Sequence, residues 1–106
     1  MQNNKMLSYL GMAMRAGKLV TGDEGVMGAI RSGQAKLVVL AVDASNNAQK
    51  KYRDKCGSFH ISLLECCSRD ELGKSIGKEE RVVIAITDSG FAQMIKKCQV
   101  KPAEVE

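Results

Sequence analysis

Apolar positions along the chain follow two rhythms, one helical and one extended. Residues 5–16 carry apolar side chains at intervals of three and four, which predicts an amphipathic helix that ends at Gly17. Residues 36–42 and 81–87 are instead nearly unbroken apolar runs, which is typical of strands covered on both faces. We therefore expect these two runs to be adjacent buried strands.

A glycine-rich segment lies between the first helix and the first buried strand. A short extended piece over 18–20 precedes Thr21, and the pattern Thr21-x-x-Glu24 is a possible capping box. This pattern predicts a helix over 22–32 that stops at Gly33.

The alternation of helices and strands continues past residue 42. A helix capped by Ser45 is predicted to end at Gly57. Three apolar residues then alternate with polar ones and predict a strand: Phe59, Ile61 and Leu63.

The last third of the chain contains a second capping box, Ser68-x-x-Glu71, which opens a helix ending near Gly77. Strands that alternate with helices indicate a sheet between helical layers, so we expect an α/β/α sandwich of about four strands. The helices after Gly22 and Ser45 should pack on this sheet. The chain then closes with a helix and a frayed tail, for which we expect these positions: Asp88 or Ser89 as the cap, a course toward Gln99, and a tail over 101–106.

Composition adds limits on the class of protein. A chain of 106 residues with 44% hydrophobic and 26% charged residues is expected to be one folded domain over 1–106, because it is too apolar for disorder. Its apolar runs are far shorter than the ~20 residues that span a bilayer. We see no signal peptide at its start, so we expect a cytoplasmic protein with no membrane partner.

The cysteines fit a reducing compartment. The sequence has four of them, with no C-x-x-C spacing and His60 as the only histidine, so zinc ligation lacks its usual pattern. We expect all four to be reduced and metal-free, with at least one packed in the core. The adjacent pair Cys66 and Cys67 leaves a redox role open.

Charge is distributed unevenly along the chain. The net charge is +4; through Gly57 nine Lys/Arg face four Asp/Glu, a balance of +5, and from Ser58 onward seven face eight, a balance of −1. A basic N-terminal part suggests an anionic partner, of which nucleic acid is the commonest. A solvated basic face is the alternative.

The sequence gives little support for a catalytic function. The sequence has no P-loop and no G-x-G-x-x-G, so no phosphate or dinucleotide motif is present. Asp43 and Asp88 follow predicted strands, where α/β enzymes place catalytic groups, but turn and cap roles explain them better. With no Trp, two Tyr and two Phe, RNA binding through stacked aromatics is also disfavoured. Any nucleic-acid partner must therefore contact glycines, backbone amides and charged side chains.

Three glycines repeat at a spacing of three residues: Gly22, Gly25 and Gly28. Each interior helical glycine costs roughly 1 kcal/mol relative to alanine, so helix stability does not explain them. A bare face lets a nucleic-acid backbone or base edge approach the main chain. Asp23 and Glu24 disfavour a simple phosphate cradle but could accept hydrogen bonds from donor groups on bases, beside their ordinary capping role.

Longer stretches resemble a known family. AGKLVTGDEGVMGAIRSGQAKLVVLAVDAS at 16–45, KC at 55–56 and ELGKSIGKEERVVIAITDSGFA at 71–92 resemble the superfamily of the large-subunit ribosomal proteins seven-Ae and thirty-e, in particular its small bacterial YlxQ-like group. The resemblance covers residues 6–95, and the S-G-x-A-K-L-V and E-L-G-x-x-I-G-K-E-x-R-V-V runs are its most specific parts. It implies an α/β/α sandwich that binds kink-turn or related structured RNA, without catalysis and without a cofactor.

In that family the contact surface joins the start of the second helix to the loop before the last strand. RNA-binding members often carry Asn-Glu where this chain has Glu24-Gly25 and Lys where it has Gly28, and their loop is commonly apolar. RNA binding is therefore the firmer implication, and kink-turn binding the finer one. The resemblance implies contacts at these positions: Lys18, Gly22, Asp23, Glu24, Gly25 and Gly28, and in the loop Ile76, Gly77, Lys78, Glu79, Glu80 and Arg81.

Three interpretations of the function remain in order of preference. The first is non-catalytic binding of structured RNA, such as ribosomal RNA, in translation, with ribosomal or translation proteins as further partners and no small-molecule substrate. The second is a protein-interaction adaptor of the translation machinery that has lost RNA binding, motivated by Gly28 and the acidic first turn. The third is a small α/β enzyme that uses strand-end carboxylates.

Overall fold

Helices and strands alternate along residues 2–98, the part of the chain that this computed structural model describes. The strands form one sheet in the order β1-β4-β2-β3, in which β2 and β3 are parallel and the other pairs antiparallel. The expected tail over 101–106 lies outside the described residues. The elements are α1 (Gln2–Arg15), β1 (Leu19–Thr21), α2 (Asp23–Ser32), β2 (Leu37–Leu40), α3 (Asn46–Ser58), β3 (Ser62–Glu65), α4 (Arg69–Ser75), β4 (Val83–Ile86) and α5 (Ser89–Cys98).

The two unbroken apolar runs are the central strands. All four residues of β2 and all four of β4 are buried, and the strands pair with Val39 opposite Ile84. A strand with both faces covered needs apolar side chains on both, which is why the runs do not alternate. The expectation of two adjacent buried strands is confirmed.

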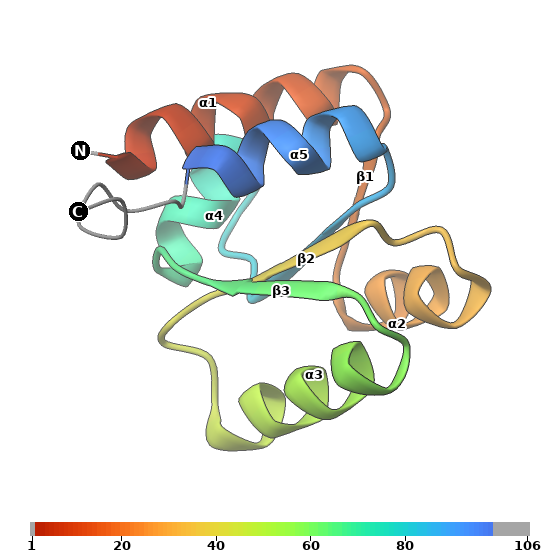
Figure 1. Ribbon diagram of the computed structural model, residues 1–106. Coiled ribbons are helices and arrows are strands. Elements are labelled where there is room, and N and C mark those ends of the chain that lie inside the picture. The colour runs from red at the N-terminus through yellow and green to blue at the C-terminus, as the bar shows by residue number, and fades with distance from the viewer. Residues whose placement is uncertain (1, 99–106) are drawn as a thin grey trace, which may run out of the picture.

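The sheet is covered by helices on both faces (Figure 1), with α1, α4 and α5 on one side and α2 and α3 on the other. Each side has its own hydrophobic cluster. Met6, Leu72 and Ile95 pack on the first face, and Ile30 and Tyr52 on the second. The predicted α/β/α sandwich with a four-stranded sheet is confirmed.

Helix starts are set by local hydrogen bonds, and one prediction is wrong. Ser45 accepts a hydrogen bond from the Ala48 amide, and Ser68 and Glu71 form the full capping box, both as predicted. Thr21 does not cap α2. The N-cap is Gly22, whose φ of 87° no β-carbon-bearing residue adopts easily, and no side chain caps this helix.

The end of α3 also differs from the prediction. The helix continues through Gly57 to Ser58, and the chain reverses at His60, whose φ is 58°. This left-handed residue shifts the following strand to Ser62–Glu65, so Phe59 caps the helix instead of starting a strand. Asp88, rather than Ser89, caps α5 by accepting from the Phe91 amide at 2.9 Å.

The cysteines lie mostly in the core. Cys56, Cys66 and Cys67 are buried and Cys98 is partly exposed, and none of the four is in a disulfide. The expected core packing of at least one cysteine is therefore confirmed. Within residues 2–98 no helix is long and apolar enough to span a bilayer.

Candidate nucleic-acid interface

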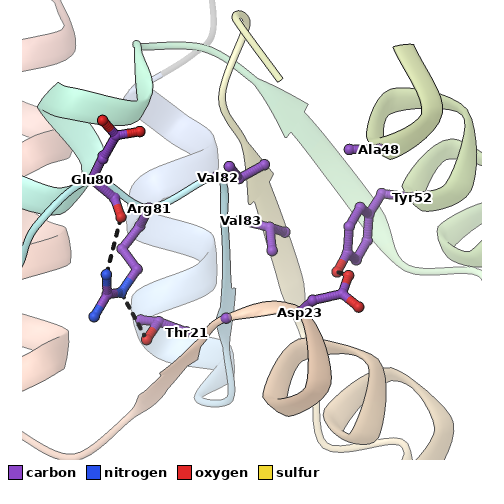
Figure 2. Close-up of a pocket in the computed structure, with 9 residues that line it drawn as sticks. Thr21, Asp23, Ala48, Tyr52, Glu80, Arg81, Val82 and Val83 are labelled. Carbon is purple, nitrogen blue, oxygen red and sulfur yellow. Dashed lines mark hydrogen bonds between the residues drawn. The ribbon is translucent and has the colours of Figure 1, made fainter. Parts of the chain in front are cut away.

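A pocket of about 520 Å³ opens at the edge of the sheet where β1 and β2 end and β4 begins. At this end of the strands the Ala41 amide donates a hydrogen bond to the Val82 carbonyl at 2.8 Å, which joins the segments after β2 and before β4. Figure 2 shows Arg81 and Thr21 on one side of the pocket and Asp23 and Tyr52 on the other, with the two valines between them. The pocket is lined by Thr21, Gly22, Asp23, Ala48, Tyr52, Glu80, Arg81, Val82 and Val83.

Asp23 forms one wall of the pocket and is already hydrogen-bonded to α3. Lys51 Nζ lies 2.8 Å from both carboxylate oxygens, and the Tyr52 hydroxyl donates to Oδ1. The hydrogen bond from Lys51 and then that from Tyr52 lower the pKa of Asp23, while burial and the neighbouring carboxylate raise the pKa of Tyr52. The side chain of Asp23 stays 60% exposed, so its oxygens can still accept hydrogen bonds from outside.

The side chain of Arg81 forms the opposite wall and is held in position by hydrogen bonds. Its guanidinium donates from Nη1 to the carbonyls of Glu80 at 3.0 Å and Glu79 at 3.4 Å, and from Nε to the Thr21 hydroxyl at 3.4 Å. Its main-chain amide donates to the Arg69 carbonyl. The guanidinium bridges the loop and the end of β1, and Nη2 has no partner within residues 2–98.

The loop over 77–81 takes its course from Gly73 in α4. A β-carbon at Gly73 would overlap the Glu79 carbonyl group, since it would lie 2.6 Å from the carbonyl carbon and 2.8 Å from Cα of Glu80. The Lys78 amide also donates to the Gly73 carbonyl at 2.9 Å. The loop therefore reaches the pocket by packing its main chain directly on a glycine.

The exposed face of α2 beside the pocket carries two glycines that the fold does not require. Gly25 and Gly28 are exposed and have ordinary helical φ values. A β-carbon at Gly28 would meet nothing within 4 Å, and one at Gly25 would make an ordinary 3.8 Å contact with Val20. Glu24, exposed beside them, has no hydrogen bond or ion pair among the described residues. The glycines leave a bare strip of helix facing solvent.

Four of the predicted site residues line the pocket, Gly22, Asp23, Glu80 and Arg81, and two lie away from it. Lys18 precedes β1, whose other end enters the pocket, so Lys18 lies at the opposite edge of the sheet, where its carbonyl accepts from Thr87. Ile76 is 7% exposed and packs in the core as the cap of α4, so its side chain is not available as a contact. The resemblance implied contacts at both positions, but strand length separates Lys18 from the pocket and helix packing buries Ile76.

Several residues of the pocket were missed in the sequence. Ala48 and Tyr52 come from α3 at a spacing of four, and Cys56 continues the same stripe, so helical periodicity could have shown that this face meets the sheet. Lys51 is one position from that stripe and could not have been paired with Asp23 by spacing. Val82 and Val83 were interpreted only as strand residues.

The arrangement suits binding better than chemistry. Within residues 2–98 no group of three His, Cys, Asp or Glu side chains is placed to hold a metal ion. The strand-end carboxylates have structural partners: Asp43 accepts from the Arg69 amide at 3.0 Å and pairs with its side chain, and Asp88 caps α5. What the pocket offers is an apolar floor between a carboxylate and a guanidinium.

Sequence comparison places these features in a family. The model of the ribosomal protein L7Ae/L30e/S12e/Gadd45 family matches residues 4–96. The RNA-binding protein YlxQ of Bacillus subtilis is 46% identical over 95 residues, which is 90% of this chain and 95% of that protein. The YlxQ of Enterococcus faecium is 43% identical over 88% of this chain and 89% of its own length. The large ribosomal subunit protein eL30B of Schizosaccharomyces pombe is 31% identical over 83% of this chain and 77% of its own. These names describe RNA-binding and ribosomal proteins rather than enzymes.

Solved structures show the same fold. A Bacillus halodurans protein of unknown function has a TM-score of 0.86 at 46% identity, covering 89% of this chain and 95% of its own. The 15.5kD RNA binding protein of Giardia lamblia has a TM-score of 0.77 at 15% identity, covering 92% of this chain and 83% of its own. The second likeness concerns the fold alone.

Proposed function

Because the chain belongs to the ribosomal protein L7Ae/L30e/S12e/Gadd45 family, we propose that it is a non-catalytic protein that binds structured RNA. Relatives that are 46% and 43% identical over most of their length are named RNA-binding proteins, which supports the same function here. The single domain predicted over 1–106 is the binding unit of this proposal.

The observation that carries the proposal is the pair of exposed glycines on α2. Gly25 and Gly28 weaken their helix, yet neither a left-handed φ nor a neighbouring side chain requires them. The strip that they leave lies on the exposed face of α2. Asp23, at the start of the same helix, lines the pocket. A partner that must approach the main chain closely explains such a strip, and an RNA backbone or base edge fits it.

The site residues take roles that follow from their charge. Glu24 and Asp23 accept hydrogen bonds from amino and imino groups of bases, with Asp23 exchanging its bond to Lys51 for one to RNA. Arg81 and Lys78 hold phosphates from the side of the loop. Gly77 and the main chain of Glu79 and Glu80 form the loop surface in this proposal.

The finer parts of the proposal concern the kind of RNA that is bound and the place of the protein in the cell. Relatives that are ribosomal proteins support ribosomal RNA, or a kink-turn-like structure within it, as the ligand. We place the protein in the cytoplasm, as part of a ribonucleoprotein in translation. Ribosomal or translation proteins are further partners of this assembly.

Substitution of Gly25 by leucine tests the glycine strip. The new side chain has room beside Val20, so Gly25→Leu should fold and gain up to about 1 kcal/mol of helix stability. Because it blocks close approach, binding to a panel of kink-turn hairpins and ribosomal RNA fragments should weaken by at least about tenfold. The matched control is Gly57→Leu, an exposed helical glycine in α3 with nothing within 4 Å, which should leave RNA binding unchanged.

Charge reversal at the loop supplies the second measurement. Lys78→Glu should weaken binding across RNA sequences and lower the salt slope by about one for each phosphate group that is no longer bound, whereas Lys97→Glu on α5 should not. A folded Gly25→Leu protein that binds every RNA like the parent would exclude the glycine strip as the RNA surface. Absence of salt-dependent RNA binding in the parent would leave the protein-interaction adaptor in its place.

A further inference from the structure

A second pocket, of about 390 Å³, lies at the opposite end of the α2 and α3 layer from the first. It is formed where both helices end and where β2 and β3 begin. Three basic or titratable side chains line it, Arg31, Lys36 and His60, and none of its lining residues is acidic. Its surface is therefore complementary to an anion.

Hydrogen bonds at the C-terminal end of α2 offset part of the negative charge that the two helix ends bring to this pocket. The Ala29 carbonyl near the end of α2 accepts from Ser32 Oγ and from the amides of Gln34 and Ala35, and the Gly33 carbonyl accepts from Lys36 Nζ at 3.4 Å. These carbonyls are satisfied inside the protein. Arg31 has no hydrogen bond or ion pair among the described residues, so its guanidinium faces solvent with all its donors available.

The same pocket presents an exposed aromatic ring. Phe59 is 44% exposed, and of the large hydrophobic side chains exposed within residues 2–98 it is the only aromatic one. Phe59 is the C-cap of α3. The next residue, His60, has a φ of 58°, and the backbone turns there toward β3. A flat ring beside a guanidinium and an ammonium group provides a stacking surface with phosphate-binding groups around it.

The exposed face of α2 runs from the first pocket toward the second. Gly25 and Gly28 are exposed on it, and Arg31, three residues further along, is exposed and lines the second pocket. Gly22 lines the first pocket, and α2 has ten residues, so the strip between them is about 15 Å long at 1.5 Å per residue. That length corresponds to a few nucleotides of an extended strand.

Lys18 lies at the same edge of the sheet as the second pocket. Its carbonyl accepts from the Thr87 amide, and the Lys36 amide donates to the Ile86 carbonyl, so Lys18 and Lys36 flank the end of β4 from its two sides. The lysine that the resemblance assigned to the first site therefore lies at the end of the sheet that holds the second pocket.

We propose that the second pocket binds a single-stranded segment of RNA that leaves the structured part held at the first pocket. One base stacks on Phe59, and Arg31, Lys36 and Lys18 hold the phosphates of the strand as it leaves the glycine strip. This inference rests on the proposed function and extends it from a single contact site to a track across the molecule.

The test compares two forms of one RNA. The probe is the tightest-binding member of the panel of kink-turn hairpins and ribosomal RNA fragments, once with blunt ends and once with five unpaired adenosines at either the 5′ or the 3′ end. One of the extensions should tighten binding by at least about fivefold, the lower end of what one stacked base contributes. Phe59→Ala should abolish this gain, and Arg31→Gln should reduce it, while binding of the blunt RNA stays unchanged in both variants.

Two variants in the other helical layer serve as matched controls. Met12→Ala removes a side chain that is 43% exposed, close to the 44% of Phe59, and Lys97→Gln removes one charge from the last turn of α5, as Arg31→Gln does in α2. Both should keep the full gain. Binding of the blunt RNA with no gain from either extension, or a gain that survives Phe59→Ala, overturns the track alone. Failure of every RNA to bind overturns the proposed function and this inference with it.

Discussion

Glycines in this protein meet two structural demands, a positive φ and a close approach of main chains. Gly22 turns the chain into α2 at a left-handed φ of 87°, which side chains disfavour. Gly73 makes room for the main chain of the loop that packs against it. Gly25 and Gly28 meet neither demand, and for this reason they carry the proposal of an external partner.

The close approach at Gly73 predicts a large effect from a small change. Gly73→Ala should lower the free energy of unfolding by about 1–3 kcal/mol, because the new methyl group overlaps the main chain of Glu79. It should also weaken RNA binding, since the loop that carries Lys78 and Arg81 must move. Urea unfolding and RNA titration of the same variant measure the two effects.

Gly57→Ala is the control for this substitution. Gly57 is an exposed helical glycine with open space around it, so alanine there should stabilise the protein by about 0.5–1 kcal/mol. Equal stabilities of the Gly73→Ala protein and the parent would mean that the loop does not depend on this contact.

At the scale of elements, α2 and α3 are joined at their N-terminal halves by Asp23, Lys51 and Tyr52. The first turn of α2 has no side-chain cap, and Asp23 and Glu24 there offset the positive end of the helix dipole. Lys51 and Tyr52 of α3 then bind the same carboxylate. The contact ties together the two helices that border both pockets.

The pKa of Asp23 predicts how this contact responds to acid. A carboxyl whose pKa is lowered on folding, here chiefly by the hydrogen bond from Lys51, contributes stability above its unfolded pKa of about 4 and loses it as the pH falls through the lower folded value. Since the pair is solvent-exposed, Asp23→Asn should cost less than about 1 kcal/mol at pH 7. The difference between the variant and the parent should shrink as the pH falls below about 4 and disappear below the folded pKa of Asp23.

Urea unfolding at pH 7 and pH 3 measures this difference, with Asp54→Asn on α3 as the matched control. Asp54 is exposed and has no partner within residues 2–98, so its substitution should change stability little at either pH. A difference between Asp23→Asn and the parent that persists undiminished at pH 3 would contradict the assignment.

At the scale of the whole molecule, two hydrophobic clusters lie on opposite faces of one sheet. The central strands contribute side chains to both clusters, Leu37 to one and Val38 to the other. The two pockets lie at opposite strand ends, the first where β2 ends and the second where β2 begins, and residues of α2 and α3 or their ends line both. The fold thus places the two pockets at opposite ends of the same helical layer.

The distribution of cysteines between core and surface predicts their reactivity. Freshly prepared, unreduced protein should show four thiols when denatured. In the native state Cys98 should react first with Ellman's reagent, since the other three are buried and burial raises the pKa of Cys56 to about 11. Cys98→Ser should remove the fast phase. Fewer than four thiols in the denatured protein, or stoichiometric zinc in the native one, would show that the expectation of reduced, metal-free cysteines is wrong.

Local patterns in the sequence determined the elements and the layers. The unbroken runs defined the central strands because a strand buried on both faces excludes polar residues, and Ser45 and Ser68 marked helix starts because their hydroxyl groups bond amides only three residues away. The resemblance added the region of the site, at the start of α2 and in the loop before β4. These features depend on neighbours within a turn of helix or a strand length, which a sequence shows directly.

Only the tertiary structure decided which side chains share a site. It turned Ile76 into the core, carried Lys18 to the far edge of the sheet and brought Lys51 and Tyr52 against Asp23 across 28 and 29 residues of sequence. It also ended α3 at Ser58, two residues before the left-handed His60, rather than at Gly57. Such outcomes depend on where each strand ends and how helices pack across the sheet, and contacts of that range are set by the packing of the whole core, not by the spacing of residues along the chain.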